Sequence, residues 1–140
     1  MRVTRSLSHV EISAKNLIHN IKQFRSLINK NTKISVAIKG NAYGHGQYQV
    51  VKILERYVDY FQVDNIEELK LLRKTSDQQA FLFGYVQKED LPTAIKLGCI
   101  LAVFSLEQLN ELNDVARRLG IKQKIHIPFD AYLGREGFLL

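Results

Sequence analysis

The residues with the clearest chemical potential lie between positions 34 and 46. Residues 34–38 form a short apolar run rich in β-branched side chains, which predicts a buried strand, and Lys39 follows at its carboxyl end. A lysine amine that loses water at such a position becomes a usable nucleophile. The loop after it holds three glycines, which would let the backbone turn tightly and come close to a ligand. The alternative is a strand that ends at the surface with Lys39 in solvent, since lysine is almost never fully buried.

The stretch from Val36 to Gly46 reads Val-Ala-Ile-Lys-Gly-Asn-Ala-Tyr-Gly-His-Gly, and it resembles the pyridoxal-phosphate attachment segment of alanine racemases. The resemblance implies that Lys39 forms a Schiff base with pyridoxal 5'-phosphate and that Tyr43 reaches the cofactor phosphate. Gly40 departs from the family pattern, where another small residue such as alanine is expected. Weaker similarities to the family follow in the same order at residues 63–69, 81–84 and 103–109.

Apolar periodicity divides the chain into alternating strands and helices. Strands are expected near residues 33–38, 60–63, 80–83, 99–103 and 124–129. Helices are expected after the N-caps Ser13, Asn65 and Ser105, from about residue 47, and over residues 89–97. Repeated βα units predict an α/β fold with a parallel sheet, either an open doubly wound sheet or part of a TIM (β/α)₈ barrel. The resemblance implies the N-terminal part of the barrel, with about five strands present and the cofactor at their carboxyl ends.

The length bears on how much of a barrel is present. A (β/α)₈ barrel takes about 250 residues, whereas this chain has 140. We therefore expect residues 1–140 to be an incomplete alanine racemase N-terminal barrel domain, with the family's C-terminal β domain absent. The first and fifth strands would then expose unpaired edges unless something covers them.

A second candidate site residue lies in the stretch from Pro128 to Gly137, where Asp130, Arg135 and Gly137 match the family pattern in place. The resemblance implies that Arg135 binds the substrate carboxylate and contacts the phenolic oxygen of the cofactor. Pro128 stands where the family usually has a lysine, carbamylated in some members, that orients the arginine. The family's Thr-Gly pair is replaced by Ala131 and Tyr132. The alternative is a surface arginine, or one paired with Asp130.

Composition and charge limit the kinds of partner and site that the sequence indicates. The net charge is +6, and we assign it to scattered solvated lysines rather than to nucleic-acid binding, because the basic cluster at residues 70–74 lacks interleaved aromatic side chains. No run of about 18 apolar residues predicts a membrane span, and the N-terminal residues do not resemble a secretory signal. The single cysteine, Cys99, is expected to be a small buried hydrophobe, which fits a reducing cytoplasm. The spacing of the histidines suggests no metal site. They are His9, His19, His45 and His126.

The resemblance implies a pyridoxal-phosphate-dependent isomerase that interconverts L- and D-alanine and supplies D-alanine for peptidoglycan, with a homodimer expected for the full-length family. In the family's two-base scheme, Lys39 would serve one face of the substrate and a tyrosine of the partner subunit's C-terminal domain the other. We therefore expect little or no racemisation by the isolated chain. Two alternatives remain: a non-catalytic remnant that binds the cofactor weakly or only associates with partners, and another fold-type III pyridoxal-phosphate enzyme such as a decarboxylase.

Overall fold

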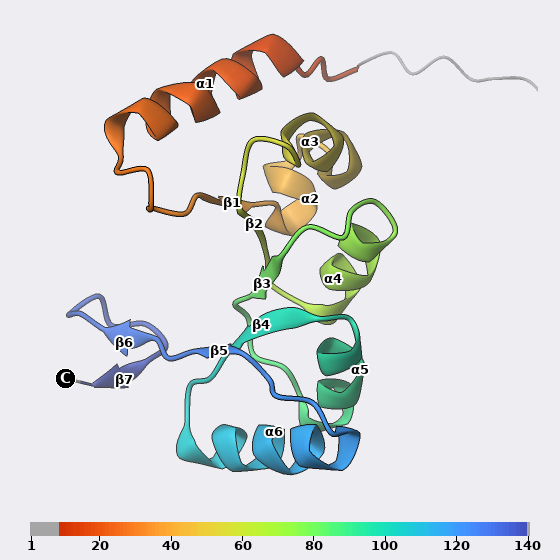
Figure 1. Ribbon diagram of the computed structural model, residues 1–140, viewed down its shortest axis with the longest axis vertical. Helices are drawn as coiled ribbons and strands as arrows, with labels where there is room; N and C mark the ends of the chain where they lie inside the picture. The colour runs from red at the N-terminus through yellow and green to blue at the C-terminus, as the bar shows by residue number, and fades with distance from the viewer. Residues whose placement is uncertain (1–8, 140) are drawn as a thin grey trace, which may run out of the picture.

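The computed structural model describes residues 9–139, which alternate between strands and helices as the sequence predicts (Figure 1). The strands are β1 (Ser35–Ala37), β2 (Tyr60–Val63), β3 (Ala80–Leu82), β4 (Cys99–Ala102), β5 (Ile125–His126), β6 (Phe129–Asp130) and β7 (Phe138–Leu139). The helices are α1 (Ala14–Leu27), α2 (Lys39–Tyr43), α3 (Gln47–Leu54), α4 (Ile66–Arg73), the 3₁₀ turn η1 (Lys88–Asp90), α5 (Leu91–Lys96) and α6 (Leu106–Leu119).

Within the described residues, five parallel strands form one sheet in the order β1-β2-β3-β4-β5. Each crossover moves the chain one strand further in the same direction. Because such crossovers are right-handed, a sheet without a reversal places its helices on one face, as in a barrel. Figure 1 shows α3, α4, α5 and α6 along the same side of the strands. The doubly wound alternative is wrong, since it requires a reversal of strand order.

The core lies between the sheet and these helices. Buried and partly exposed residues alternate along β2 and along β3. Phe61, Val63 and Leu82 are fully buried against the helices, and their neighbours on the other face of the sheet are partly exposed. Cys99 lies in β4 and is buried as expected, and burial raises the pKa of its thiol to about 11 despite the opposing charge of Arg73. Among residues 9–139, no helix is both long and apolar enough to cross a membrane.

Polar side chains begin three of the helices where the sequence predicts. Ser13 Oγ accepts the N–H of Asn16, Asn65 Oδ1 accepts that of Glu68, and Ser105 Oγ accepts that of Gln108. Each contact satisfies one of the backbone donors that the first turn of a helix leaves without a partner. The caps therefore set where each helix leaves the preceding strand or loop.

Helix α1 is tied to the start of the sheet through Asp59. The carboxylate of Asp59 accepts hydrogen bonds from Arg25 of α1 at 2.7 Å and from the N–H of Ile34 at 2.8 Å, with Lys33 at 3.1 Å. Burial alone would raise the pKa of Asp59, but these three contacts outweigh it and lower the pKa to about 2. One carboxylate thus joins α1 to the segments that lead into β1 and β2.

The expected fifth strand over residues 124–129 is shorter than predicted. Strand β5 covers Ile125–His126, and β6 begins a separate two-stranded sheet with β7. Pro128 lies at the break, where it has no N–H for a ladder and its carbonyl accepts the N–H of Phe138 at 2.9 Å. The prediction of one continuous strand is wrong because proline redirects the chain after β5.

Candidate active site

The segment after β1 is a left-handed helical turn rather than an irregular loop. The φ angle is 56° at Gly40 and 54° at Asn41, Ala42 and Tyr43. This region costs residues other than glycine about 1–2 kcal/mol each, so the surrounding contacts must hold the turn. The N–H of Ala42 bonds to the carbonyl of Ile38 at 2.8 Å, and the N–H of Gly46 bonds to that of Asn41 at 2.9 Å. The turn therefore directs Lys39 away from the strand at a defined place.

Lys39 lies at the carboxyl end of β1, and its side chain is 30% exposed. Its Nζ is 3.4 Å from Oδ1 of Asp64, which directly follows β2. Lys39 borders a cavity of about 200 Å³, which we call the lysine cavity. Its lining residues are Lys39, Asp64, Phe83, Gly84, Tyr85, Phe104, Arg135 and Glu136. They come from the carboxyl ends of four neighbouring strands and from the segment before β7, which is where barrel enzymes place their active sites.

Arg135 lines the same cavity as Lys39, so the structure brings together two of the three side chains singled out in the sequence. The Arg135 side chain is 62% exposed, and its Nε lies 3.5 Å from the carboxylate of Glu136. Asp130 instead accepts the backbone N–H groups of Leu133 at 2.9 Å and Gly134 at 3.1 Å. The ion pair in the structure is therefore with Glu136, not with Asp130.

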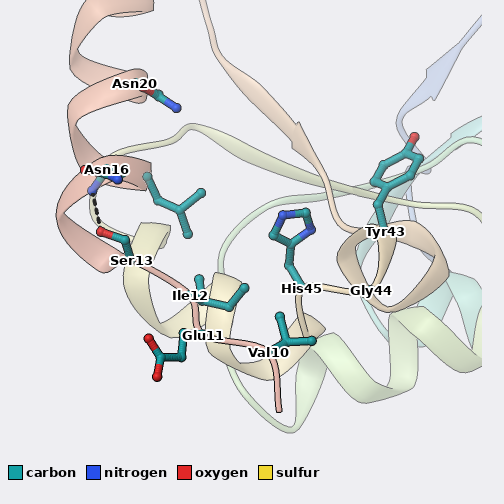
Figure 2. Close-up of a pocket in the computed structure, with 10 residues that line it drawn as sticks. Val10, Glu11, Ile12, Ser13, Asn16, Asn20, Tyr43, Gly44 and His45 are labelled. Atoms are coloured by element: carbon teal, nitrogen blue, oxygen red, sulfur yellow. Dashed lines mark hydrogen bonds between the residues drawn. The ribbon is translucent and has the colours of Figure 1, made fainter. Parts of the chain in front are cut away.

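Tyr43 lies apart from the lysine cavity. The residue is 66% exposed. It lines a separate hollow of about 480 Å³ between α1 and residues 39–43, which we call the lysine turn. Figure 2 shows this hollow, with His45 in its middle and the Tyr43 ring pointing away from Ser13 and Asn16. His45 Nδ1 lies 2.9 Å from the carbonyl of Ala42 and so supports the turn. The cofactor-binding role of Tyr43 stays a prediction.

The lysine cavity has chemical groups that suit pyridoxal phosphate. It contains an amine for an aldehyde, a guanidinium for an anionic oxygen, and aromatic side chains that can pack beside a flat ring. The aromatic side chains are Phe83, Tyr85 and Phe104. Among residues 9–139, no group of three or more His, Cys, Asp or Glu side chains is placed to hold a metal ion.

A family model described as "Alanine racemase, N-terminal domain" matches residues 12–140. The chain belongs to this family. It is 37% identical over 131 residues to the alanine racemase of Methanococcus maripaludis, and this match covers 92% of this chain and 35% of that protein. It is 32% identical over 133 residues to alanine racemase 2 of Caldanaerobacter subterraneus, and this match covers 94% of this chain and 34% of that protein. The chain thus spans about a third of the length of these relatives.

A solved alanine racemase of Clostridium difficile 630 superposes with a TM-score of 0.84 and 34% identity, over 89% of this chain and 33% of that one. The alanine racemase of E. faecalis, at 21% identity, has the same TM-score and shows the shared fold. The sheet of this racemase domain is therefore the beginning of a TIM barrel, and the resemblance in the lysine segment is confirmed as membership of the family.

Sequence reasoning missed two carboxylates of the racemase domain. Both lie within residues 63–69, where the sequence shows a weak similarity to the family but singles out neither Asp64 nor Glu68 as a site residue. Oε1 of Glu68 accepts the N–H of Gly40 at 2.7 Å, and Oε2 accepts the N–H of Asp64 at 2.8 Å. A usable signal for Asp64 is its place directly after β2, the strand that pairs with β1, which leads into Lys39.

Proposed function

We propose that this chain supplies the cofactor-attachment part of a pyridoxal-phosphate-dependent racemase that acts on alanine. The observation that carries the proposal is the meeting of Lys39 and Arg135 at one cavity, at the carboxyl ends of the strands. The relatives named above are alanine racemases, which favours racemisation over decarboxylation.

Each residue has a distinct role in this proposal. Bound pyridoxal phosphate would supply an electron sink for the negative charge that develops on the substrate Cα. Lys39 Nζ would attach the cofactor and then move the Cα proton on one face of the substrate. Arg135 would bind the substrate carboxylate through its planar guanidinium. The Tyr43 hydroxyl, which is accessible on an exposed side chain, would donate to the cofactor phosphate.

The same proposal covers the oligomeric state, the location and the metabolic role of the whole enzyme. We propose that it is a cytoplasmic homodimer that supplies D-alanine for peptidoglycan. Because this chain spans about a third of its relatives' length, we expect the isolated chain to racemise alanine poorly. Substantial turnover by the purified 140-residue chain would contradict that expectation.

The test is covalent attachment at Lys39. The purified chain is mixed with pyridoxal phosphate, its visible absorbance is recorded, and the adduct is reduced with borohydride and located by peptide mass spectrometry. We expect the absorbance band and the labelled peptide at Lys39, and both should be lost in Lys39→Ala. Lys88→Ala is a matched control, because Lys88 is an exposed ion-paired lysine on η1. Equal labelling of the wild type and Lys39→Ala would refute the proposal.

A non-catalytic remnant is the second candidate, and a specific observation favours it. Pro128 breaks the fifth strand just before the segment that carries the largely exposed Arg135. A remnant would label at Lys39 yet gain no protection of that adduct from added alanine. Two results together would favour the racemase: added D- or L-alanine reduces the labelling of Lys39, and this reduction is lost in Arg135→Ala.

A further inference from the structure

The carboxylate of Glu68 touches both groups that determine where Lys39 lies. Its Oε1 accepts the N–H of Gly40, the residue directly after Lys39, at 2.7 Å. Its Oε2 accepts the N–H of Asp64 at 2.8 Å, and the Asp64 carboxylate lies 3.4 Å from Lys39 Nζ. Hydrogen bonds to an ionised acceptor are about twice as strong as neutral ones. One side chain therefore connects the backbone beside the lysine with the partner of its amine.

Gln47 makes a second connection between the lysine turn and α4. Its buried side chain donates to the carbonyl of Glu68 at 2.9 Å. Its backbone N–H donates to the side chain of Asn41 at 2.8 Å, within the left-handed turn. The turn is thus joined to the first turn of α4 by two routes, one through Glu68 and one through Gln47.

A second strand-to-helix junction in the same chain shows which part of this arrangement is ordinary. Gln108 occupies the position in α6 that Glu68 occupies in α4, three residues after the N-cap. Its Oε1 accepts the N–H of Phe104, the residue before the cap, at 2.8 Å. Glu68 makes the equivalent bond to Asp64. An amide with one acceptor oxygen is therefore enough to begin such a helix, and the second oxygen of Glu68 is additional.

We propose that Glu68 is a positioning residue for Lys39, and that its second oxygen holds the lysine turn against Asp64 so that Nζ stays at the lysine cavity. This inference deepens the proposed function, because it concerns the residue to which the cofactor would attach. It also makes a claim about Lys39 that needs no cofactor. Glutamine at position 68 should keep the bond that starts α4, as Gln108 does in α6, and lose the bond to Gly40, since an amide nitrogen cannot accept an N–H.

The test compares Glu68→Gln with Glu67→Gln, a matched control on the same helix whose side chain is 74% exposed and pairs with Lys70. Three quantities are measured: labelling of Lys39 by pyridoxal phosphate and borohydride, reductive methylation of Lys39 by formaldehyde, and hydrogen exchange of the Gly40 amide. Urea unfolding of each variant reports whether the fold is kept.

For Glu68→Gln we expect a cooperative urea transition whose midpoint is moderately lower, because one hydrogen bond of the lysine turn is lost. We also expect about tenfold less pyridoxal-phosphate labelling, because small misplacement of a reacting group is costly. Methylation of Lys39 should rise at least about twofold as its contact with Asp64 loosens, and Gly40 exchange should accelerate by about tenfold, the effect of losing one hydrogen bond to a charged acceptor. Glu67→Gln should match the wild type in all three.

Two results would overturn the inference: wild-type methylation and exchange in Glu68→Gln, or equal changes in Glu67→Gln. Failure of Glu68→Gln to fold would also contradict it, because Gln108 shows that glutamine suffices at such a junction. If the wild type takes no pyridoxal phosphate at Lys39 while methylation and exchange still respond to Glu68→Gln, the proposed function fails and the positioning role stands.

Discussion

Lys39 and Arg135 line one cavity, but the segments that carry them are held by different contacts. The lysine turn follows the buried Ile38, contains the buried Ala42, and is bonded to α3 and α4 through side chains. Residues 127–139, which we call the Arg135 segment, are held mainly by the short β6–β7 ladder and the turn around Asp130. Tyr132 in this segment is 99% exposed.

The comparison shows two ways of presenting a charged side chain. The position of Lys39 depends on contacts between elements that are far apart in sequence, so it shares the stability of the core. The position of Arg135 depends on neighbours within a dozen residues. We therefore expect substitutions on the lysine side to reduce the stability of the whole fold and those in the Arg135 segment to act locally.

The largest effect is expected for Gly84→Ala. A Cβ at Gly84 would overlap the carbonyl oxygen of Asp64, so the backbone between β2 and β3 would have to move. We expect a loss of about 4 kcal/mol or more in the free energy of unfolding, measured by urea titration. Gly134→Ala in the Arg135 segment is the control, because its Cβ would meet open space and only its positive φ is strained. A loss of about 1 kcal/mol is expected there, and similar losses at both positions would break the comparison.

Leu82→Ala should follow. Leu82 is fully buried in β3, and its truncation leaves a cavity that costs about 3 kcal/mol by urea unfolding. Leu133→Ala, in the Arg135 segment, removes a mostly exposed side chain and should stay within about 0.5 kcal/mol of the wild type. A large loss for Leu133→Ala would show that this segment packs against the core.

The lowered pKa of Asp59 leads us to expect that the free energy of unfolding depends on pH. Its pKa in the folded chain, about 2, lies below its ordinary value, so its contribution is present above about pH 4 and is lost as the pH falls toward 2. We expect Asp59→Asn to lose about 1–2 kcal/mol at pH 7, and this difference from the wild type should shrink near pH 2. A difference that is the same at both pH values would show that charge is not the cause.

Among the four principal variants, the smallest effect is expected for Asp130→Ala. Within residues 9–139, the donors to its carboxylate are the N–H groups of Leu133 and Gly134, both near the surface, so the loss should be about 1 kcal/mol. We expect the protection that alanine gives against labelling of Lys39 to weaken, because Arg135 would lose its turn, while labelling without alanine stays unchanged. Reduced labelling without alanine would mean that the two segments are coupled.

Local signals in the sequence were enough to predict most elements. Periodic apolar residues placed β2, β4 and α6 close to their observed bounds, and the caps at Ser13 and Asn65 were confirmed. Such features depend on neighbours a few residues apart, which a sequence displays directly. The fifth strand is shorter than predicted because Pro128 has no N–H with which to extend the ladder.

The sequence by itself determined the identity of the lysine segment, the order of the βα units and membership of the racemase family. Only the tertiary structure decided which side chains meet: Asp64 with Lys39, Glu68 with Gly40, and Arg135 with the lysine cavity. The physical reason is that strand ends from separate βα units converge only when the sheet assembles. The tertiary structure also decided that the lysine turn is left-handed. Hydrogen bonds from α3 and α4 hold a backbone conformation that these residues would not adopt alone.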